Sequence, residues 1–348
     1  MGLTLTDLEA PEGYERLVEA KDPQVGLHAL ICLHSTVLGP AAGGCRMWAY
    51  GTEAEAIADV TRLAKGMTYK NAMADLGLGG GKSVIIGDAK RNKTPELMRA
   101  FGRAVQALDG RYYTAEDVGI SPRDMAHAAE ETRYAVGLSK ASGDPSPWTA
   151  EGVFRCLKLG AQDTFGSDDL NGFRVLVQGL GHVGLSLAEK LHAAGASLIV
   201  TDISRTALQE ARDRLDAEIC APEAVFDQQM DIFAPCALGG VLTPEHVARL
   251  SARLVCGAAN NQLATPEVAQ DLMARAITYL PDYVVNAGGI ISVASEIHGT
   301  GDAWRRARLD GIVDRVAQML STAREQGRST TVIADEMVES MLARSRSA

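Results

Sequence analysis

The chain has 348 residues, 46% of them hydrophobic, and carries a formal charge of −10 at pH 7. This length and hydrophobic content allow a large core, which we expect to divide into two domains. The acidic balance and the lack of any basic run argue against a nucleic-acid partner, because such binding needs cations that neutralise phosphates.

Cysteine usage and the first residues bear on the compartment. The six cysteines are scattered without a CxxC pair, which favours reduced, buried thiols over disulfides or a metal site. Residues 1–20 contain five acidic residues and no apolar run, so they do not resemble a signal peptide. No segment reaches the roughly 18 uninterrupted apolar residues of a membrane span. We therefore expect a cytoplasmic protein with no membrane partner and no metal.

The first predicted elements are a strand over residues 25–33 and a helix over residues 53–67, in which apolar residues recur at helical spacing. Between them lies a glycine-rich stretch, residues 38–46. Glycine clusters occur where backbone closely approaches a ligand, and also in plain turns between strands. Both interpretations are open at this point.

A second glycine run, residues 77–81, ends in Lys82 and precedes residues 84–86, which predict a buried strand. A phosphate-binding P-loop needs glycine where this chain has Leu76, and it needs its strand before the loop. The P-loop interpretation therefore fails. A lysine at this junction can bind phosphate, form a Schiff base or act as a general base. A second lysine, Lys70, lies twelve residues before it.

The first half of the chain continues as mixed α/β structure. Thr94, followed by proline, marks a helix start with a capping hydroxyl. Residues 111–118 predict a strand that ends in acidic residues, among them Asp117. We therefore expect a first domain over residues 1–141, followed by a linker within the turn-forming residues 142–147.

A helix that begins near Thr149 leads into the most specific local pattern of the chain. Residues 173–178 predict a strand, residues 179–184 have the spacing GxGxxG, and residues 197–201 predict a second strand that ends at Asp202. In this context the glycines permit a tight turn and close approach of a pyrophosphate to a helix N-terminus. The predicted cofactor contacts are Gly179, Leu180, Gly181, His182, Val183, Gly184 and Asp202.

Asp202 lies 18 residues after the last glycine of this loop. An acid there accepts hydrogen bonds from the ribose hydroxyls and repels a 2′-phosphate, so NAD is favoured over NADP. Arg205 is close enough to weaken that preference. His182 is expected to face solvent rather than to act as a base.

Three further strands are predicted, at residues 231–234, 254–257 and 276–279. Ligands of open α/β sheets bind at the carboxyl ends of the strands, so the turns there add Cys236, Ala237, Ala258 and Asn260 as candidate contacts. Asn260 and Asn261 are also common turn formers, which leaves an alternative for that pair. Two helices, over residues 302–324 and 331–345, complete the chain.

Together these motifs resemble the amino-acid dehydrogenase superfamily and, within it, the leucine, valine and phenylalanine dehydrogenases. The resemblance extends along nearly the whole chain. Its most specific segments are residues 38–46, 66–70, 79–82, 114–119, 231–240, 258–263 and 281–289.

The resemblance implies a catalytic group on the first domain. Lys82 corresponds to the general base, which deprotonates the water that attacks the iminium left by hydride transfer. Burial and the like charge of Lys70 would favour the neutral amine that a base needs. Lys70 corresponds to the lysine that holds the substrate α-carboxylate, and Asp117 to the acid that interacts with the substrate amine and relays protons. Further substrate contacts implied there are Gly43, Gly44 and Met67.

On the second domain the resemblance implies contacts near the nicotinamide. Thr149 and Asn286 correspond to positions beside that ring. Asn260 corresponds to a contact with either the substrate or the nicotinamide.

The pocket residues indicate an apolar substrate side chain. Related glutamate dehydrogenases have lysine where this chain has Ala42 and serine where it has Val293, so an acidic side chain would be buried unpaired, at a cost of several kcal/mol. The small Ala42 widens the substrate pocket. Ile290 and Val293 are expected to line this pocket from the other domain and to offset that widening. Ala115 is more typical of leucine dehydrogenases. Cys45 replaces the usual threonine, with no consequence that the sequence predicts.

The expected fold is α/β, with an N-terminal mixed domain for substrate binding and oligomerisation and a Rossmann NAD-binding domain over residues 142–327, separated by a cleft. A C-terminal helix within residues 328–348 is expected to pack back on the first domain. The expected activity is NAD-dependent oxidative deamination of leucine, valine or isoleucine by a homo-oligomer. The alternatives are aromatic amino acids as substrates, or a non-catalytic regulator, which would be expected to lack Lys82 or Asp117.

Overall fold

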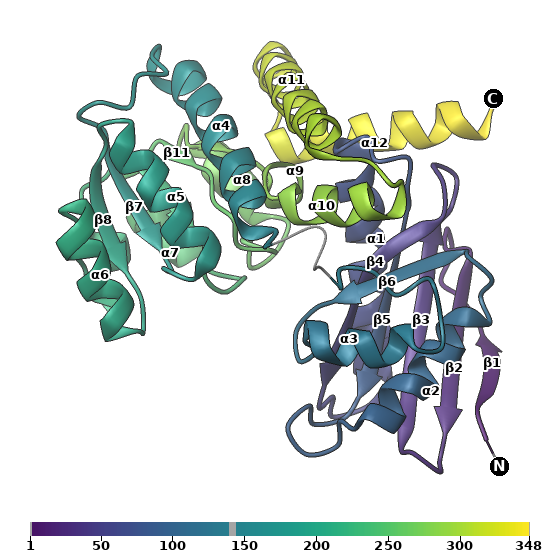
Figure 1. Ribbon diagram of the computed structural model, residues 1–348. Helices are drawn as coiled ribbons and strands as arrows, with labels where there is room; N and C mark the ends of the chain where they lie inside the picture. The colour runs from purple at the N-terminus through teal and green to yellow at the C-terminus, as the bar shows by residue number, and fades with distance from the viewer. Residues whose placement is uncertain (1, 139–143, 348) are drawn as a thin grey trace. The chain divides into compact units, whose positions relative to one another are not determined.

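The computed structural model describes residues 2–138 and 144–347. These residues form two compact units, each built on a six-stranded sheet (Figure 1). Unit 1 comprises Met1–Asp144, Ile290–Arg305 and Val338–Ala348, and unit 2 comprises Pro145–Gly289 and Arg306–Met337. The predicted linker at residues 142–147 lies partly outside the described residues.

The sheet of unit 1 is mixed. Its strands are β1 (Thr4–Leu8), β2 (Arg16–Asp22), β3 (Leu27–Ser35), β4 (Ala41–Trp48), β5 (Gly79–Ile86) and β6 (Tyr112–Glu116). Their order is β1-β2-β3-β5-β4-β6. The pairs from β1 to β5 are antiparallel, whereas β4 pairs in parallel with both β5 and β6. The carboxyl ends of these three strands therefore lie at one edge.

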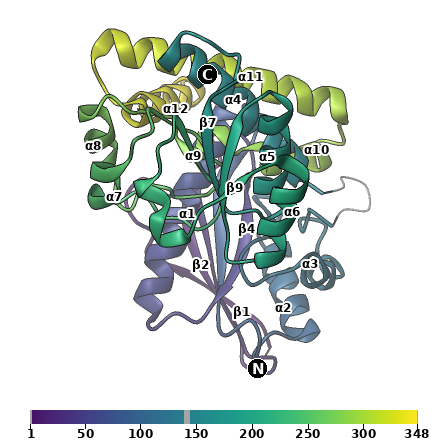
Figure 2. The ribbon, with the colours of Figure 1, turned by 90° about the vertical axis from the view of Figure 1, so that its left-hand side faces the viewer.

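Helices cover both faces of this sheet. They are α1 (Glu53–Met73) on one face and α2 (Pro95–Gln106) and α3 (Pro122–Ala129) on the other (Figure 2). Because side chains alternate along a strand, Ile85 of β5 packs with Phe101 of α2, whereas its neighbour Val84 packs with Val60 of α1. The two faces thus have separate cores.

The helix starts of unit 1 follow the rules of capping. Thr52, Thr94 and Ser121 each accept a hydrogen bond from a backbone N–H of the first turn, and α2 and α3 have proline at the start. The prediction of a capped helix start at Thr94 is confirmed.

The two glycine clusters of unit 1 lie largely in strands, so a plain turn, one of the two open interpretations of residues 38–46, does not describe Gly43 and Gly44. Gly43 and Gly44 lie within β4, and residues 79–81 begin β5 with Lys82 following in the same strand. A Cβ on Gly43 would lie 1.9 Å from the carbonyl oxygen of Gly81. Here glycine permits backbone to approach backbone within the fold.

The sheet of unit 2 is entirely parallel. Its strands are β7 (Arg174–Gln178), β8 (Ser197–Thr201), β9 (Glu218–Ile219), β10 (Ile232–Pro235), β11 (Leu254–Val255) and β12 (Thr278–Tyr279). Numbered in order of appearance, the strands run 3-2-1-4-5-6 across the sheet. This is the order of a Rossmann fold, so the predicted fold class is confirmed.

The remaining helices are α4 (Ser146–Phe165), α5 (His182–Ala193), α6 (Arg205–Leu215), the 3₁₀ helix η1 (Pro222–Asp227), α7 (Pro244–Arg249), α8 (Val268–Ala274), α9 (Asp282–Val285), α10 (Gly288–Ile297), α11 (Asp302–Gln326) and α12 (Thr330–Arg346). None of the helices in the described part of the chain combines the length and apolar character that crossing a membrane requires.

The compact units differ from the predicted domains in two segments. Residues 328–337, within the region predicted to pack back on the first domain, belong to unit 2. Ile290–Arg305, predicted to belong to the Rossmann domain, clusters with unit 1. Ile290 and Val293 therefore belong to the same unit as Lys82. The last part of α12, from Val338 onward, also belongs to unit 1, where Tyr69 of α1 donates a hydrogen bond to Glu339.

Candidate functional site

A buried ion pair joins Lys82, in the middle of β5, to Asp117, which directly follows β6. Nζ of Lys82 lies 2.6 Å from Oδ2 of Asp117, and only 8% of the lysine side chain is exposed. Burial by itself would raise the pKa of Asp117, but the Lys82 ammonium, followed by Arg46, outweighs this effect and lowers that pKa below its ordinary value. The structure thus brings together the two predicted catalytic residues.

Arg46 connects this pair to α1. Its Nε lies 3.5 Å from Oδ2 of Asp117, and its guanidinium donates to Oδ2 of Asp59 at 2.9 Å. Asp59 also accepts hydrogen bonds from the Tyr50 hydroxyl at 2.7 Å and from Arg62 at 2.7 Å. Neither Arg46 nor Asp59 was among the predicted site residues.

The predicted glycines of β4 allow the neighbouring segments to approach the strand closely. A Cβ on Gly44 would lie 2.7 Å from the carbonyl oxygen of Glu116 and 2.9 Å from Cβ of Asp117. A Cβ on Gly43 would contact Cγ of Met67 at 3.0 Å. Gly43, Gly44 and Met67 are therefore neighbours of the ion pair or of the strand that carries it.

Lys70 and Ala42 occupy the region where α1 meets the strands. Lys70 is half-buried in the last turn of α1. The next residue, Asn71, donates to the carbonyl oxygens of Gly79 at 2.6 Å and Ala42 at 3.3 Å, which ties the end of α1 to β4 and β5. Ala42 is only 1% exposed.

The predicted specificity residues Ala115 and Val293 both lie next to Gly137. A Cβ placed on Gly137 would be 3.6 Å from Cβ of Ala115 and 3.9 Å from Cγ2 of Val293. The backbone N–H of Gly137 donates to Glu296 of α10 at 3.1 Å, which holds these segments together. Ile290, also on α10, is half-buried. An apolar wall is thus present in unit 1.

Cys45 lies on the opposite face of β4 from Arg46. It is fully buried in the core beneath α2 and α3, and burial raises the pKa of its thiol to about 12. All six cysteines are free. Cys45 therefore belongs to the core beneath α2 and α3 rather than to the sheet face that carries Lys82.

In unit 2, the loop between β7 and α5 is shaped to accept an anion. Gly179 has φ +97°, and a Cβ on Gly184 would lie 1.9 Å from the carbonyl oxygen of Gly179. Helix α5 begins after Gly181 without any side-chain cap, and a Cβ on Gly181 would meet open space. The first N–H groups of α5 are therefore available to a pyrophosphate. His182 is exposed and Val183 is half-buried.

Asp202 follows β8 and holds this loop. Its carboxylate accepts hydrogen bonds from the backbone N–H groups of Leu180 at 2.6 Å and Ser204 at 2.7 Å. A carboxylate has about four acceptor positions, so both ribose hydroxyls can still bind. Ile203, which follows, is 97% exposed, and Arg205 is exposed as well. The dinucleotide interpretation of this segment fits the geometry.

The other candidate contacts of unit 2 lie at the carboxyl ends of its strands. The buried Asn286 donates to the carbonyl oxygen of Ala258 at 3.1 Å and to Oδ1 of Asn260 at 2.9 Å. Asn261 has φ +53°, typical of a turn former, while Asn260 keeps its side chain on Asn286. The turn-former interpretation therefore fits Asn261, and the ligand contact of Asn260 stays a prediction.

Cys236, Ala237 and Thr149 complete this group. The N–H of Cys236 donates to Gln178 of β7 at 2.7 Å, and a Cβ on Gly179 would lie 2.8 Å from Cβ of Ala237. The turn after β10 thus lies directly on the glycine loop. Thr149 is 9% exposed and packs against Gly288, where a Cβ would lie 2.3 Å from the threonine nitrogen.

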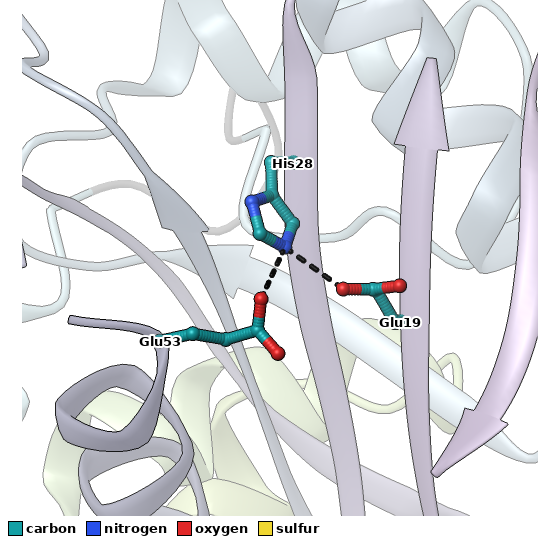
Figure 3. Close-up of side chains that lie close together, drawn as sticks. All are labelled: Glu19, His28 and Glu53. Carbon is teal, nitrogen blue, oxygen red and sulfur yellow. Dashed lines mark hydrogen bonds and ion pairs between the residues drawn. The ribbon is translucent and has the colours of Figure 1, made fainter. Parts of the chain in front are cut away.

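One group of potential metal ligands occurs in the described part of the chain, at Glu19, His28 and Glu53 (Figure 3). Nε2 of His28 lies 3.0 Å from Glu19 and 3.6 Å from Glu53. Nζ of Lys21 lies 2.5 Å from the same Glu19 oxygen, so an ammonium already balances this carboxylate. We interpret the group as an ion-paired surface cluster; it contains no predicted site residue.

Sequence reasoning missed Arg46 and Asp59 because their pairing depends on tertiary structure. Arg46 follows Gly44 by two residues, and this alternation along β4 places both on the face that carries Lys82. This two-residue spacing was the signal in the sequence that could have identified Arg46. The position of Asp59, on a helix that crosses β5, requires knowledge of the fold.

Fold and site together define the class of this protein. A Rossmann unit with a glycine loop and a terminal acid binds a nicotinamide dinucleotide, and a buried lysine–carboxylate pair on the other unit can exchange protons with a substrate. The protein is an amino-acid dehydrogenase that depends on NAD(P).

Comparison with known proteins gives the family. Residues 15–134 match the Glu/Leu/Phe/Val dehydrogenase dimerisation domain, and residues 201–340 match the Glutamate/Leucine/Phenylalanine/Valine dehydrogenase domain. The chain belongs to the glutamate/leucine/phenylalanine/valine dehydrogenase family.

Its relatives within this family differ in substrate. The leucine dehydrogenase of Thermoactinomyces intermedius is 48% identical, over 94% of this chain and 90% of the relative. The phenylalanine dehydrogenase of Bacillus thermotolerans is 43% identical, over 96% and 90%. The crystal structure of the L-tryptophan dehydrogenase from Nostoc punctiforme superposes with a TM-score of 0.86 at 38% identity, over 96% of this chain and 97% of that one.

Proposed function

We propose that this protein is an NAD-dependent leucine dehydrogenase that also accepts valine and isoleucine. The reaction converts the L-amino acid, NAD⁺ and water into the 2-oxo acid, ammonium and NADH, with release of one proton. The Lys82–Asp117 pair is the observation that carries this proposal. The 48% identity with a leucine dehydrogenase supports the choice of substrate.

The roles of the unit 1 residues follow from charge. Lys70 binds the substrate α-carboxylate, and Asp117 accepts a hydrogen bond from the substrate amine. Bound NAD⁺ would supply the acceptor for the hydride on the substrate Cα, and the substrate would then be an iminium. Lys82, as the neutral amine, removes a proton from the water that adds to that iminium carbon, and the resulting carbinolamine loses ammonia to form the oxo acid.

The choice of NAD rests on Asp202. Its carboxylate faces the position of the ribose hydroxyls and would repel the 2′-phosphate of NADP. Thr149, Asn260 and Asn286 are proposed to contact the nicotinamide half of the cofactor. The exposed Arg205 is the residue that would weaken the preference for NAD over NADP.

The substrate side chain is proposed to contact Ala42, Ala115, Ile290 and Val293. None of these residues offers a partner for an acidic side chain, whose burial would cost several kcal/mol. The small Ala42 supports an alternative, an aromatic substrate, and the similarity to a tryptophan dehydrogenase points the same way.

The deciding experiment measures the initial rate of NADH formation with leucine, valine, phenylalanine, tryptophan and glutamate. We expect leucine or valine to give the highest kcat/KM. Phenylalanine or tryptophan in first place would establish the alternative, and glutamate in first place would overturn the pocket argument. NADP⁺ in place of NAD⁺ tests the cofactor.

Two variants test the catalytic assignment. Lys82→Ala and Asp117→Asn are each expected to lower kcat about 10²–10⁴-fold, the usual contribution of a positioned acid or base. Activity near the wild-type level in Lys82→Ala would show that another group is the base.

We further propose a cytoplasmic homo-oligomer. The six free thiols suit a reducing compartment, and the matched domain of residues 15–134 is described as a dimerisation domain. Light scattering coupled to gel filtration gives the mass; a monomer at assay concentration would contradict the proposal.

A further inference from the structure

A series of side chains with alternating charge leads from the surface of α1 to the Lys82–Asp117 ion pair of unit 1. Arg62 contacts Asp59, Asp59 contacts Arg46, Arg46 contacts Asp117 and Asp117 contacts Lys82. The exposed fraction of the side chain is 54% at Arg62, whereas it is 17% at Asp59, 20% at Arg46, 23% at Asp117 and 8% at Lys82. The inner members are thus shielded from solvent, where charge interactions are strong.

The guanidinium of Arg46 is hydrogen-bonded at one end and ion-paired at the other. Its Nη1 donates to Asp59 at 2.9 Å, and its Nε lies 3.5 Å from Oδ2 of Asp117, the same oxygen that Lys82 approaches. The Tyr50 hydroxyl donates to Oδ2 of Asp59 at 2.7 Å and anchors the far end. Arginine presents several donors in one rigid plane, which suits a residue that must contact two carboxylates at once.

Two cations share one carboxylate, and this matters during turnover. In the proposed function Lys82 must be neutral to accept a proton from water. Asp117 then loses its nearest cation, and the guanidinium of Arg46 remains as its partner. Arg46 therefore keeps Asp117 ionised and oriented while Lys82 changes its protonation state.

Three other titratable groups in the described part of the chain interact with Asp117, and none of them supplies positive charge. They are Cys45 of β4 and Tyr112 and Glu116 of β6. Burial raises the pKa of the Cys45 thiol to about 12 and also raises the pKa of Tyr112. Among these neighbours, cationic stabilisation of Asp117 comes from Lys82 and Arg46.

We propose that Arg46 and Asp59 are positioning residues of the dehydrogenase: Asp59 fixes Arg46, and Arg46 holds Asp117 as an oriented carboxylate through the proton cycle of Lys82. This inference rests on the proposed function of Lys82 and Asp117 and assigns roles to two further residues.

The test compares Arg46→Met, Arg46→Lys and Asp59→Asn with wild type across pH 7–11, using leucine and NAD⁺. Arg46→Met removes one of the two cations that contact Asp117 among the described residues, so the ammonium form of Lys82 is favoured. The low-pH limb of kcat/KM for leucine should then move up by about one pH unit. Arg46→Lys keeps the charge but cannot span both carboxylates, so kcat should fall about 10-fold with a smaller pH shift.

Asp59→Asn should resemble Arg46→Lys, because Arg46 loses its anchor while Asp117 keeps its cation. The KM for NAD⁺ should stay within about 2-fold of wild type in all three variants, since none lies in unit 2. Arg99→Lys is the matched control: Arg99 contacts Glu96 and Glu130 on the surface of α2, and its kinetics should equal those of wild type.

Several outcomes would overturn the inference. An unshifted pH profile in Arg46→Met with unchanged kcat would do so, as would equal changes in the KM values for leucine and NAD⁺, which indicate general damage. Circular dichroism and the melting temperature identify a variant that fails to fold; Arg46→Lys, the mildest change, then decides. Inactive wild-type protein with all five amino acids would instead contradict the proposed function.

Discussion

Gly80 of β5 and Thr68 of α1 pack backbone against backbone: a Cβ on Gly80 would lie 2.0 Å from the backbone nitrogen of Thr68 and 2.1 Å from its hydroxyl oxygen. No rotamer change of Thr68 relieves the overlap with a backbone atom. This contact sets how closely α1, which carries Met67 and Lys70, approaches the strand that carries Lys82.

Gly80→Ala should therefore lower the free energy of unfolding by about 3 kcal/mol, the upper range for overpacking in a core. It should also lower kcat, because α1 must shift away from β5. Urea denaturation at a fixed protein concentration measures the first effect. Gly66→Ala is the control within the same helix: Gly66 has open space around it, and alanine there should stabilise by about 0.5–1 kcal/mol.

This contact also shows why part of the fold could not be predicted. Glycine is unfavourable in strands, so residues 79–81 indicate a loop when considered locally. In the structure they lie in a strand, and glycine is needed there because α1 and β3 come too close for a side chain. The arrangement of β7, the glycine loop and α5 was predicted correctly because these segments are consecutive in sequence. The Arg46–Asp59 pair was missed because strand register and helix packing, rather than sequence spacing, bring it together.

Asp202 supports the glycine loop through Leu180 and is proposed to select NAD over NADP. Its replacement should separate these two roles. Asp202→Asn retains an oxygen that can accept from Leu180 but removes the negative charge. We expect kcat/KM with NAD⁺ to fall about 10–100-fold, the usual loss for a hydrogen bond to a charged group. The value with NADP⁺ should rise or stay constant.

The ratio of the two cofactors is the informative measurement for Asp202. An equal fall with NAD⁺ and NADP⁺ would show that Asp202 supports the loop without selecting the cofactor. Arg249→Gln, which changes a surface pair with Asp227 elsewhere in unit 2, should leave the ratio unaltered.

His34 predicts a pH dependence of stability. It is buried, its Nδ1 lies 2.8 Å from the hydroxyl of Thr68, and burial, followed by the charge of Lys65, lowers its pKa from 6.5 to about 4. The unfolded chain takes up this proton as the pH falls below about 6.5, whereas the folded chain does not until about 4. Stability is therefore lost as the pH falls through that window, by about 2 kcal/mol between pH 7 and pH 5.

His34→Asn keeps a side chain able to bond Thr68 and removes the titration. Denaturant unfolding at pH 7 and pH 5 should show a loss on acidification smaller by about 2 kcal/mol in this variant than in wild type. Equal losses in the two proteins would mean that His34 does not contribute to acid sensitivity. Protein concentration must be constant, because an oligomer gains stability by mass action.

Val293 offers the sharpest test of substrate choice, since it lies beside Gly137 and Ala115 in unit 1. Val293→Ala removes two methyl groups from the proposed pocket wall. Each such group discriminates by about 1–3 kcal/mol, so the kcat/KM for phenylalanine relative to leucine should rise at least about 10-fold. Val247→Ala, in the core of unit 2, loses the same volume and should reduce stability without altering that ratio. If both variants leave the ratio unchanged, Val293 does not contact the substrate side chain, and the choice between aliphatic and aromatic substrates rests on Ala42 and Ile290.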